Sequence, residues 1–248
     1  MATVTNKEKQ RLRAERAAAA LKEKQRRERR RQVLTVVGVV AAIALIIGAG
    51  FFINSMRDDT KANAQAAPTT GSEFGLTIGP DSAPHKVVIY EDYLCPFCGE
   101  LEKQTHEELA TLADQGKVQV EYRPIVILNG AGPYSARAAV IFTLVQQKYG
   151  DEAAKKFHDL LYANQPSEEG PFPSRDDLYA LAAQAGADPT ALKTAMEAGD
   201  GAEFVAAGTN AAKALGIKST PTIIVDGEAF TNGRTIDELA QNLLDTLQ

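Results

Sequence analysis

An uncharged apolar run stands out in the first quarter of the chain. Residues 33–53 read VLTVVGVVAAIALIIGAGFFI, without one charged side chain. At ~1.5 Å per residue, a helix of this length crosses a hydrocarbon layer of ~30 Å. A buried core helix normally keeps a polar stripe, and a cleaved signal peptide has a shorter apolar run of ~7–15 residues. We therefore predict a single, uncleaved transmembrane helix at 33–53.

The pattern changes after this run. Residues 54–72 are polar and read as a flexible linker. From residue 73 to 248, short apolar runs and helical periodicities indicate one folded domain of α/β class. We predict strands at 86–91, 118–123, 222–225 and 228–230, and helices at 96–114, 134–148, 152–164, 175–185, 189–198, 202–215 and 235–247.

The order of these elements restricts the topology. A strand, a helix and a second strand form a βαβ unit, which implies parallel strands with a right-handed crossover. A helical block, at about 126–217, separates this unit from the last two strands. Asp226-Gly227 between those strands is a strong signal for a two-residue hairpin turn.

Charge divides the chain at the apolar run. Residues 1–32 contain 12 Lys and Arg against 4 Asp and Glu, a local net charge of +8, whereas the rest of the chain carries −13. Positive flanks stay in the cytoplasm, so we expect a cytoplasmic N-terminus and an extracytoplasmic domain at 73–248. The basic segment either attracts anionic lipid or only sets this topology. No aromatic residue is interleaved with its charge, which argues against nucleic-acid binding.

Composition excludes several classes of protein. The chain is 44% hydrophobic, which rules out a disordered protein, and its two cysteines are too few for a disulfide-stapled scaffold or a four-cysteine zinc site. The three histidines, His85, His106 and His158, are scattered along the sequence. We therefore predict no metal site.

The two cysteines form one motif, Cys95-Pro96-Phe97-Cys98, where a predicted strand meets a predicted helix. The N-terminal end of a helix offers free N–H groups and a positive dipole end, which favour a thiolate at Cys95. Pro96 suits the first helical position, and Cys98 falls within the first turn. The motif predicts a redox pair in which Cys95 is the nucleophile and Cys98 the resolving thiol. Covalent haem attachment would need His where Gly99 stands, and a structural disulfide closing so short a loop would stabilise little.

Residues 91–99, EDYLCPFCG, together with 220–227, TPTIIVDG, resemble the DsbA-type thiol:disulfide oxidoreductases of the thioredoxin superfamily. The resemblance covers about residues 73–248 and implies a thioredoxin-like fold with a helical insertion. It also implies a cis-proline at Pro221 packed against Cys95, and a Thr220 backbone that binds extended substrate. The redox-active disulfide would serve without a bound cofactor, and a quinone-coupled membrane oxidase of the DsbB or vitamin K epoxide reductase-like kind would reoxidise it.

The chain departs from that family at two positions. DsbA-type enzymes often carry Glu six residues before the first cysteine, where it assists proton transfer, and here that residue is Ile89. Glu91 and Asp92 are the candidates to replace it, unless they are exposed ends of the strand. Phe97 stands where strongly oxidising relatives often have His; with Tyr93 it could form an apolar rim for unfolded chains, although Tyr93 is equally suited to the core.

These observations predict a membrane-anchored, extracytoplasmic enzyme that forms disulfides in exported proteins. Two alternatives stay open. The same cysteine pair could run the reaction in the opposite direction, as a disulfide reductase or isomerase, and Thr220 does not decide between them. A different class of protein, a tethered chaperone that binds unfolded chains without redox turnover, would use the same apolar rim.

Overall fold

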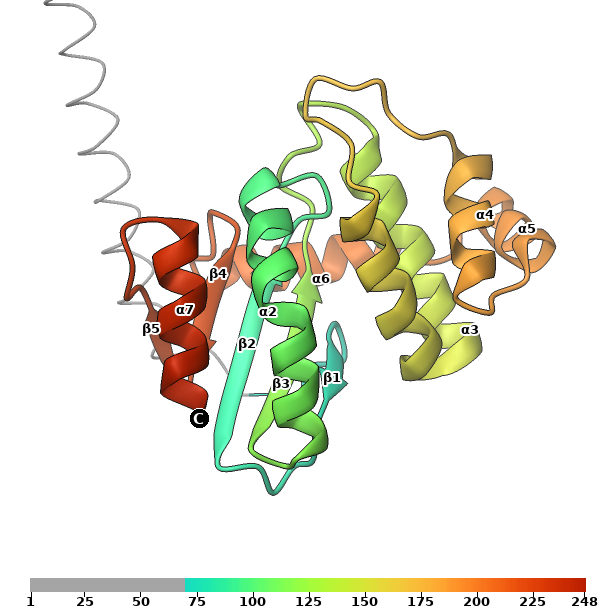
Figure 1. Cartoon of the computed structure of the whole chain (residues 1–248). Coiled ribbons are helices and arrows are strands. Elements are labelled where there is room, and N and C mark those ends of the chain that lie inside the picture. The colour runs from blue at the N-terminus through green and yellow to red at the C-terminus, as the bar shows by residue number, and fades with distance from the viewer. Residues whose placement is uncertain (1–69) are drawn as a thin grey trace, which may run out of the picture. The chain divides into compact units, whose positions relative to one another are not determined.

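The computed structural model describes residues 70–248. Their elements, in chain order, are β1 (Leu76–Ile78), β2 (His85–Glu91), α2 (Pro96–Asp114), β3 (Val118–Pro124), α3 (Tyr134–Ala163), α4 (Arg175–Gln184), α5 (Pro189–Ala198), α6 (Ala202–Ala214), β4 (Thr222–Val225), β5 (Glu228–Phe230) and α7 (Ile236–Leu247) (Figure 1). The predicted basic segment and membrane helix, and all but the end of the predicted linker, lie outside the described residues. Within the described part, no helix has the length and apolar character needed to span a membrane.

The strands form one mixed sheet in the order β1-β3-β2-β4-β5. β2 and β3 pair in parallel, with Val87 opposite Val120, as the βαβ unit predicts. β4 runs antiparallel to β2, and β5 returns antiparallel to β4. Asp226 and Gly227 connect β4 to β5 with φ angles of 52° and 87°, which is the left-handed geometry of the predicted hairpin turn.

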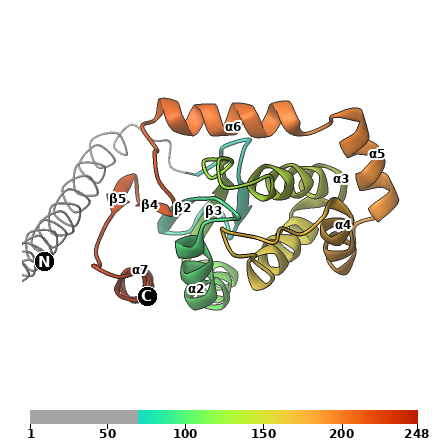
Figure 2. The same cartoon turned by 90° about the horizontal axis from the view of Figure 1, so that it is seen from above.

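Two helical layers cover the sheet because successive residues of β2 point to opposite faces. Val87 and Ile89 belong to the main core, to which α2 contributes Leu101 and Leu109 and α7 contributes Leu243. Val88 and Tyr90 point the other way and form a smaller cluster with Ala212 of α6. Figure 2 shows α6 on one side of the sheet and α2 with α7 on the other.

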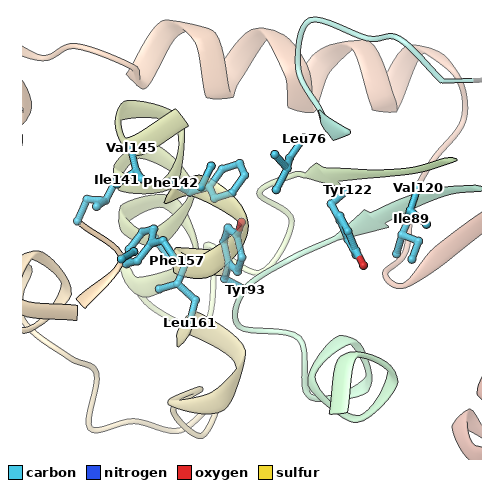
Figure 3. Packing of buried hydrophobic residues seen from close by; sticks show 14 of the residues in the cluster. Leu76, Ile89, Tyr93, Val120, Tyr122, Ile141, Phe142, Val145, Phe157 and Leu161 are labelled. Carbon is cyan, nitrogen blue, oxygen red and sulfur yellow. The ribbon is translucent and has the colours of Figure 1, made fainter. Parts of the chain in front are cut away.

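The helices α3 to α6 lie between β3 and β4 in the chain, and α3 extends the main core away from the sheet. Figure 3 shows Phe142, Phe157 and Leu161 of α3 around Tyr93, which follows β2. Gly150, at φ 84° and ψ 177°, interrupts the helical geometry of α3. It therefore separates the two helices predicted at 134–148 and 152–164. The fold is the predicted thioredoxin-like α/β arrangement with a helical insertion.

One strand is missing from the sequence-based prediction. β1 pairs antiparallel with β3, and Leu76 lies opposite Tyr122. A strand of three residues is too short to show the alternation on which the prediction rests, and it exists because the edge of β3 is available to pair with it.

Candidate active site

Cys95 occupies the N-cap of α2, as the motif predicts. Its backbone is extended, with φ −71° and ψ 115°, and Pro96 begins the helix. The N–H groups of Cys98 and Gly99 both donate to the Cys95 carbonyl oxygen, at 3.1 Å each. The first turn is thus fixed, and Cys95 Sγ lies at the end of the helix where backbone N–H groups and the dipole stabilise negative charge.

A second segment reaches Cys95 from the far end of the chain. The peptide bond between Thr220 and Pro221 is cis, in agreement with the resemblance. The Thr220 carbonyl oxygen lies 3.3 Å from Cys95 Sγ and accepts a hydrogen bond from the thiol. Residues 125 positions apart thereby form one site.

The surroundings of Cys95 favour its thiolate. A hydrogen bond from the Cys98 thiol, helped by the Thr220 side chain and by the backbone N–H groups of Cys98 and Phe97, outweighs the effect of burial and lowers the Cys95 pKa from 9.0 to about 7. A thiol with this pKa is partly ionised at neutral pH, so it is a nucleophile and a good leaving group.

The surroundings of Cys98, in contrast, favour its protonated thiol. Its side chain is buried, with 1% of its surface exposed. Burial first, and then the hydrogen bond that it gives to Cys95, raise the Cys98 pKa well above its usual value. The pair is therefore asymmetric, with an ionisable outer sulfur and a protonated inner one.

The aromatic residues beside the motif differ in exposure. Among the large hydrophobic residues of the described region, Phe97 is the one that is exposed, with 61% of its surface accessible. Tyr93 is 1% exposed and packs against Phe142, with ring centroids 5.7 Å apart. Phe97 therefore lies on the surface beside Cys95, whereas Tyr93 belongs to the core.

The insertion supplies a residue that the sequence did not single out. Gln165 follows α3, and its Nε2 atom donates to the carbonyl oxygens of Tyr93 and Cys95, at 2.9 Å each. A Cβ added to Gly99 would clash with the end of the Gln165 side chain, which would then have to move away from the loop. Gln165 thus joins the loop before α2 to the helical insertion.

Glu91 and Asp92 are both buried, with 1% and 0% of their surfaces exposed, so the reading of them as exposed strand ends is wrong. Asp92 accepts four hydrogen bonds, from the N–H groups of Leu94, Ile127 and Leu128 and from the Ser135 hydroxyl, at 2.7–3.0 Å. A carboxylate held by four donors fixes the loop that follows β2 and ties it to the segment between β3 and α3.

Glu91 belongs to a buried group of charges beneath the cysteines. Its Oε1 atom lies 2.6 Å from Nε2 of His158 in α3, a residue that no sequence pattern marked as functional. Burial opposes a charged imidazole, but the carboxylates of Glu91 and Asp159 outweigh it and raise the His158 pKa to about 10. Glu102 of α2 lies in the same group, and its burial raises its pKa to about 8.

Comparisons with known proteins agree with this geometry. The sequence model of a family described as thioredoxin matches residues 72–245. The chain is 26% identical to disulfide bond formation protein D of Bacillus subtilis over 168 residues, which is 67% of this chain and 74% of that protein. It is also 30% identical over 162 residues, 65% of the chain, to Na⁺/H⁺ antiporter NhaA 3 of Salinispora tropica, and there it spans only 23% of the relative's length.

Solved structures share the fold. BdbD of Bacillus subtilis, in its oxidised form, superposes with a TM-score of 0.63 at 23% identity, covering 73% of this chain and 96% of that one. Reduced DsbA of Mycobacterium tuberculosis superposes with a TM-score of 0.56 at 25% identity, covering 71% of this chain and 100% of that one.

Proposed function

Because this chain belongs to the thioredoxin family, as one of its DsbA-type thiol:disulfide oxidoreductases, we propose that it forms disulfide bonds in exported proteins by exchange through Cys95 and Cys98. One observation carries the proposal. The outer sulfur, Cys95, is held in a setting that favours its thiolate, and the inner sulfur, Cys98, is held in one that favours its thiol.

The reaction proceeds in two exchanges. A substrate thiolate attacks Cys95 Sγ of the enzyme disulfide, a substrate–Cys95 mixed disulfide forms, and Cys98 leaves as a thiolate that takes up a proton. A second substrate thiolate then attacks the substrate sulfur of the mixed disulfide, and Cys95 leaves. Two electrons pass from two substrate thiols to the enzyme, which ends as a dithiol. The low pKa of Cys95 favours the second step, because a more acidic thiol leaves faster.

The proposed setting is the outer face of a membrane. The apolar residues 33–53 would anchor the chain, and the basic residues 1–32 would remain in the cytoplasm. A quinone-coupled membrane oxidase would then return the dithiol to the disulfide. Protease added to the outside of intact cells should degrade residues 73–248 and leave the N-terminal segment; protection of both segments would contradict this orientation.

The direction of electron transfer distinguishes a disulfide oxidase from a reductase or isomerase. A thiolate at Cys95 stabilises the reduced enzyme, so for an oxidase we expect the reduction potential of the Cys95–Cys98 pair to lie above the ~−270 mV of a thioredoxin-like reductase and towards the ~−120 mV of a strong oxidant. Equilibration with glutathione, with the two redox forms separated by mass after thiol alkylation, measures this potential. A value at or below that of thioredoxin would replace the proposed direction with the reverse one.

Single cysteine variants test the exchange itself. With a reduced two-cysteine peptide as substrate, Cys95→Ser should abolish oxidation, and Cys98→Ser should accumulate a mixed disulfide at Cys95 when it is offered an oxidised peptide. A tethered chaperone without redox turnover would keep its effect on client folding in Cys95→Ser. Retention of that effect, with no change in client disulfides, would contradict the proposal.

A further inference from the structure

Six buried oxygen atoms that lack a hydrogen-bond partner belong to residues packed around His158. In the described part of the chain, seven buried side-chain polar atoms have no partner, and only Arg123 Nη2 lies apart from this group. The six are Glu91 Oε2, both carboxyl oxygens of Glu102, and the hydroxyls of Tyr93, Tyr122 and Tyr162. The three tyrosine rings lie 4.6–5.9 Å from the His158 ring. Buried polar atoms are normally satisfied, so such a concentration calls for an explanation.

Three of these residues have ligand chemistry and suitable spacing. One donor atom each from Glu91, Glu102 and His158 lies within 4.8 Å of the other two. They come from three different elements, β2, α2 and α3, and are 0–2% exposed. Neither oxygen of Glu102 has a partner, although a buried carboxyl group without hydrogen bonds is costly.

The charges of the group favour an added cation. Two carboxyl groups face one imidazole, and Lys155 at the edge is already paired with Asp159. A divalent cation would balance two carboxylates and a neutral imidazole, and it would satisfy the oxygens of Glu102.

We propose that Glu91, Glu102 and His158 form a binding site for a divalent transition-metal ion, and that Zn²⁺ is the ion that the donor set fits best. Imidazole nitrogen with carboxylate oxygen suits Zn²⁺, whereas Ca²⁺ and Mg²⁺ prefer oxygen donors alone. The ion takes the place of the proton between His158 Nε2 and Glu91 Oε1, so the two residues that now hydrogen-bond to each other both bind it. The ion displaces one proton from His158 and one from Glu102, since ligands must be deprotonated.

A surface cavity borders the proposed site. A cavity on the outside of α2 and α3 is lined by Glu102, Asp159 and Tyr162, among other residues. Glu102 therefore borders both this cavity and the buried group. A bound ion would link the sheet, α2 and the insertion directly beneath the active-site turn, so it would stabilise the folded chain.

Zinc titration of the full chain in its disulfide form tests the proposal, because joining Cys95 to Cys98 removes the thiols as rival ligands. We expect calorimetry to show one saturable Zn²⁺ site, with release of protons to a weak buffer, and no comparable binding of Ca²⁺. Zn²⁺ should raise the thermal midpoint. Co²⁺ in place of Zn²⁺ should give the visible absorption of a low-coordinate site without a thiolate charge-transfer band.

Matched variants locate the ion. Glu102→Gln should weaken Zn²⁺ binding at least tenfold and remove the thermal shift, while the metal-free variant stays folded because its carboxyl oxygens make no hydrogen bonds. Glu107→Gln, on the same helix with a 91% exposed side chain, should bind as the parent does. His106→Asn removes an imidazole beside the cavity and should also have no effect. Absence of saturable binding in the parent chain, or binding that His106→Asn abolishes and Glu102→Gln leaves intact, would overturn the proposal. Neither result depends on disulfide exchange, so the proposed function would stand.

Discussion

At the scale of single residues, the reactivity of this chain comes from the difference between two neighbouring sulfurs. Cys95 and Cys98 share one turn of helix, yet their pKa values move in opposite directions. The largest influence on Cys95 is the hydrogen bond from Cys98, and the largest on Cys98 is burial. The ionisation of Cys95 therefore depends on the presence of the Cys98 thiol.

This dependence predicts the effect of removing the inner thiol. Cys98→Ala deletes the hydrogen bond to the Cys95 thiolate, and a hydrogen bond to a charged group contributes ~1.5–3 kcal/mol. The Cys95 pKa should rise by roughly one unit, which corresponds to ~1.4 kcal/mol. Thiolate absorbance followed against pH measures it. Cys98→Ser retains a donor and should shift the pKa less, and an unchanged value in Cys98→Ala would contradict the assigned cause.

Replacing Asp92 should destabilise the folded protein. Asp92→Asn replaces an oxygen that accepts hydrogen bonds with an NH₂ group that faces the N–H groups of Ile127 and Leu128. Since buried donors are then left unpaired, the free energy of unfolding should fall by roughly 3 kcal/mol. Urea unfolding measures the change. Asp114→Asn, at an exposed position in α2, is the control and should change stability by less than about 0.5 kcal/mol. Equal effects in the two variants would show that the network does not hold the loop.

At the scale of elements, the insertion and the thioredoxin core meet through Gln165 and Gly99. Gln165→Ala removes two hydrogen bonds from the loop before α2, and Gly99→Ala pushes the Gln165 side chain away. Each variant should lose about 1–2 kcal/mol of stability, and the double variant should lose little more than one of them because both disrupt the same contact. Denaturant unfolding of the parent protein, the two single variants and the double variant gives the double-mutant cycle. Additive losses would mean that the two residues act separately.

The elements also show how far the sequence could predict the structure. The β2–α2–β3 unit, the Asp226-Gly227 hairpin and the N-cap position of Cys95 follow from local patterns, and the structure confirms them. β1 was missed because its three residues carry no period of their own. His158 and Gln165 were missed for another reason. Their roles depend on contacts with residues about 70 positions away, and no local pattern in α3 marks them.

At the scale of the whole molecule, the Cys95 pKa makes stability depend on pH and on redox state. The folded value of about 7 lies below the usual 9.0, so the shift contributes stability to the reduced protein that is fully present above pH 9 and is lost as pH falls through 7. The disulfide form has no such contribution. Apart from Cys98, the other buried ionisable groups titrate in both forms, so their effects cancel in the difference.

The difference in the free energy of unfolding between the reduced and disulfide forms should therefore change by roughly 2 kcal/mol in favour of the reduced form from pH 6 to pH 8.5. Above pH 9 the raised pKa of Cys98 opposes the trend, because burial disfavours its thiolate. Paired denaturant curves at several pH values measure the difference. A difference that stays constant between pH 6 and 8.5 would contradict the linkage.

The most direct test of the account is the ionisation of Cys95 itself in the reduced protein. The rate of alkylation by iodoacetamide, measured against pH with the modified cysteine identified by mass, reports the thiolate of each sulfur separately. The account predicts that Cys95 reacts with a midpoint at a pKa of about 7 and that Cys98 stays unreactive over the same range. A midpoint near 9 for Cys95, or equal reactivity of the two sulfurs, would contradict the central claim.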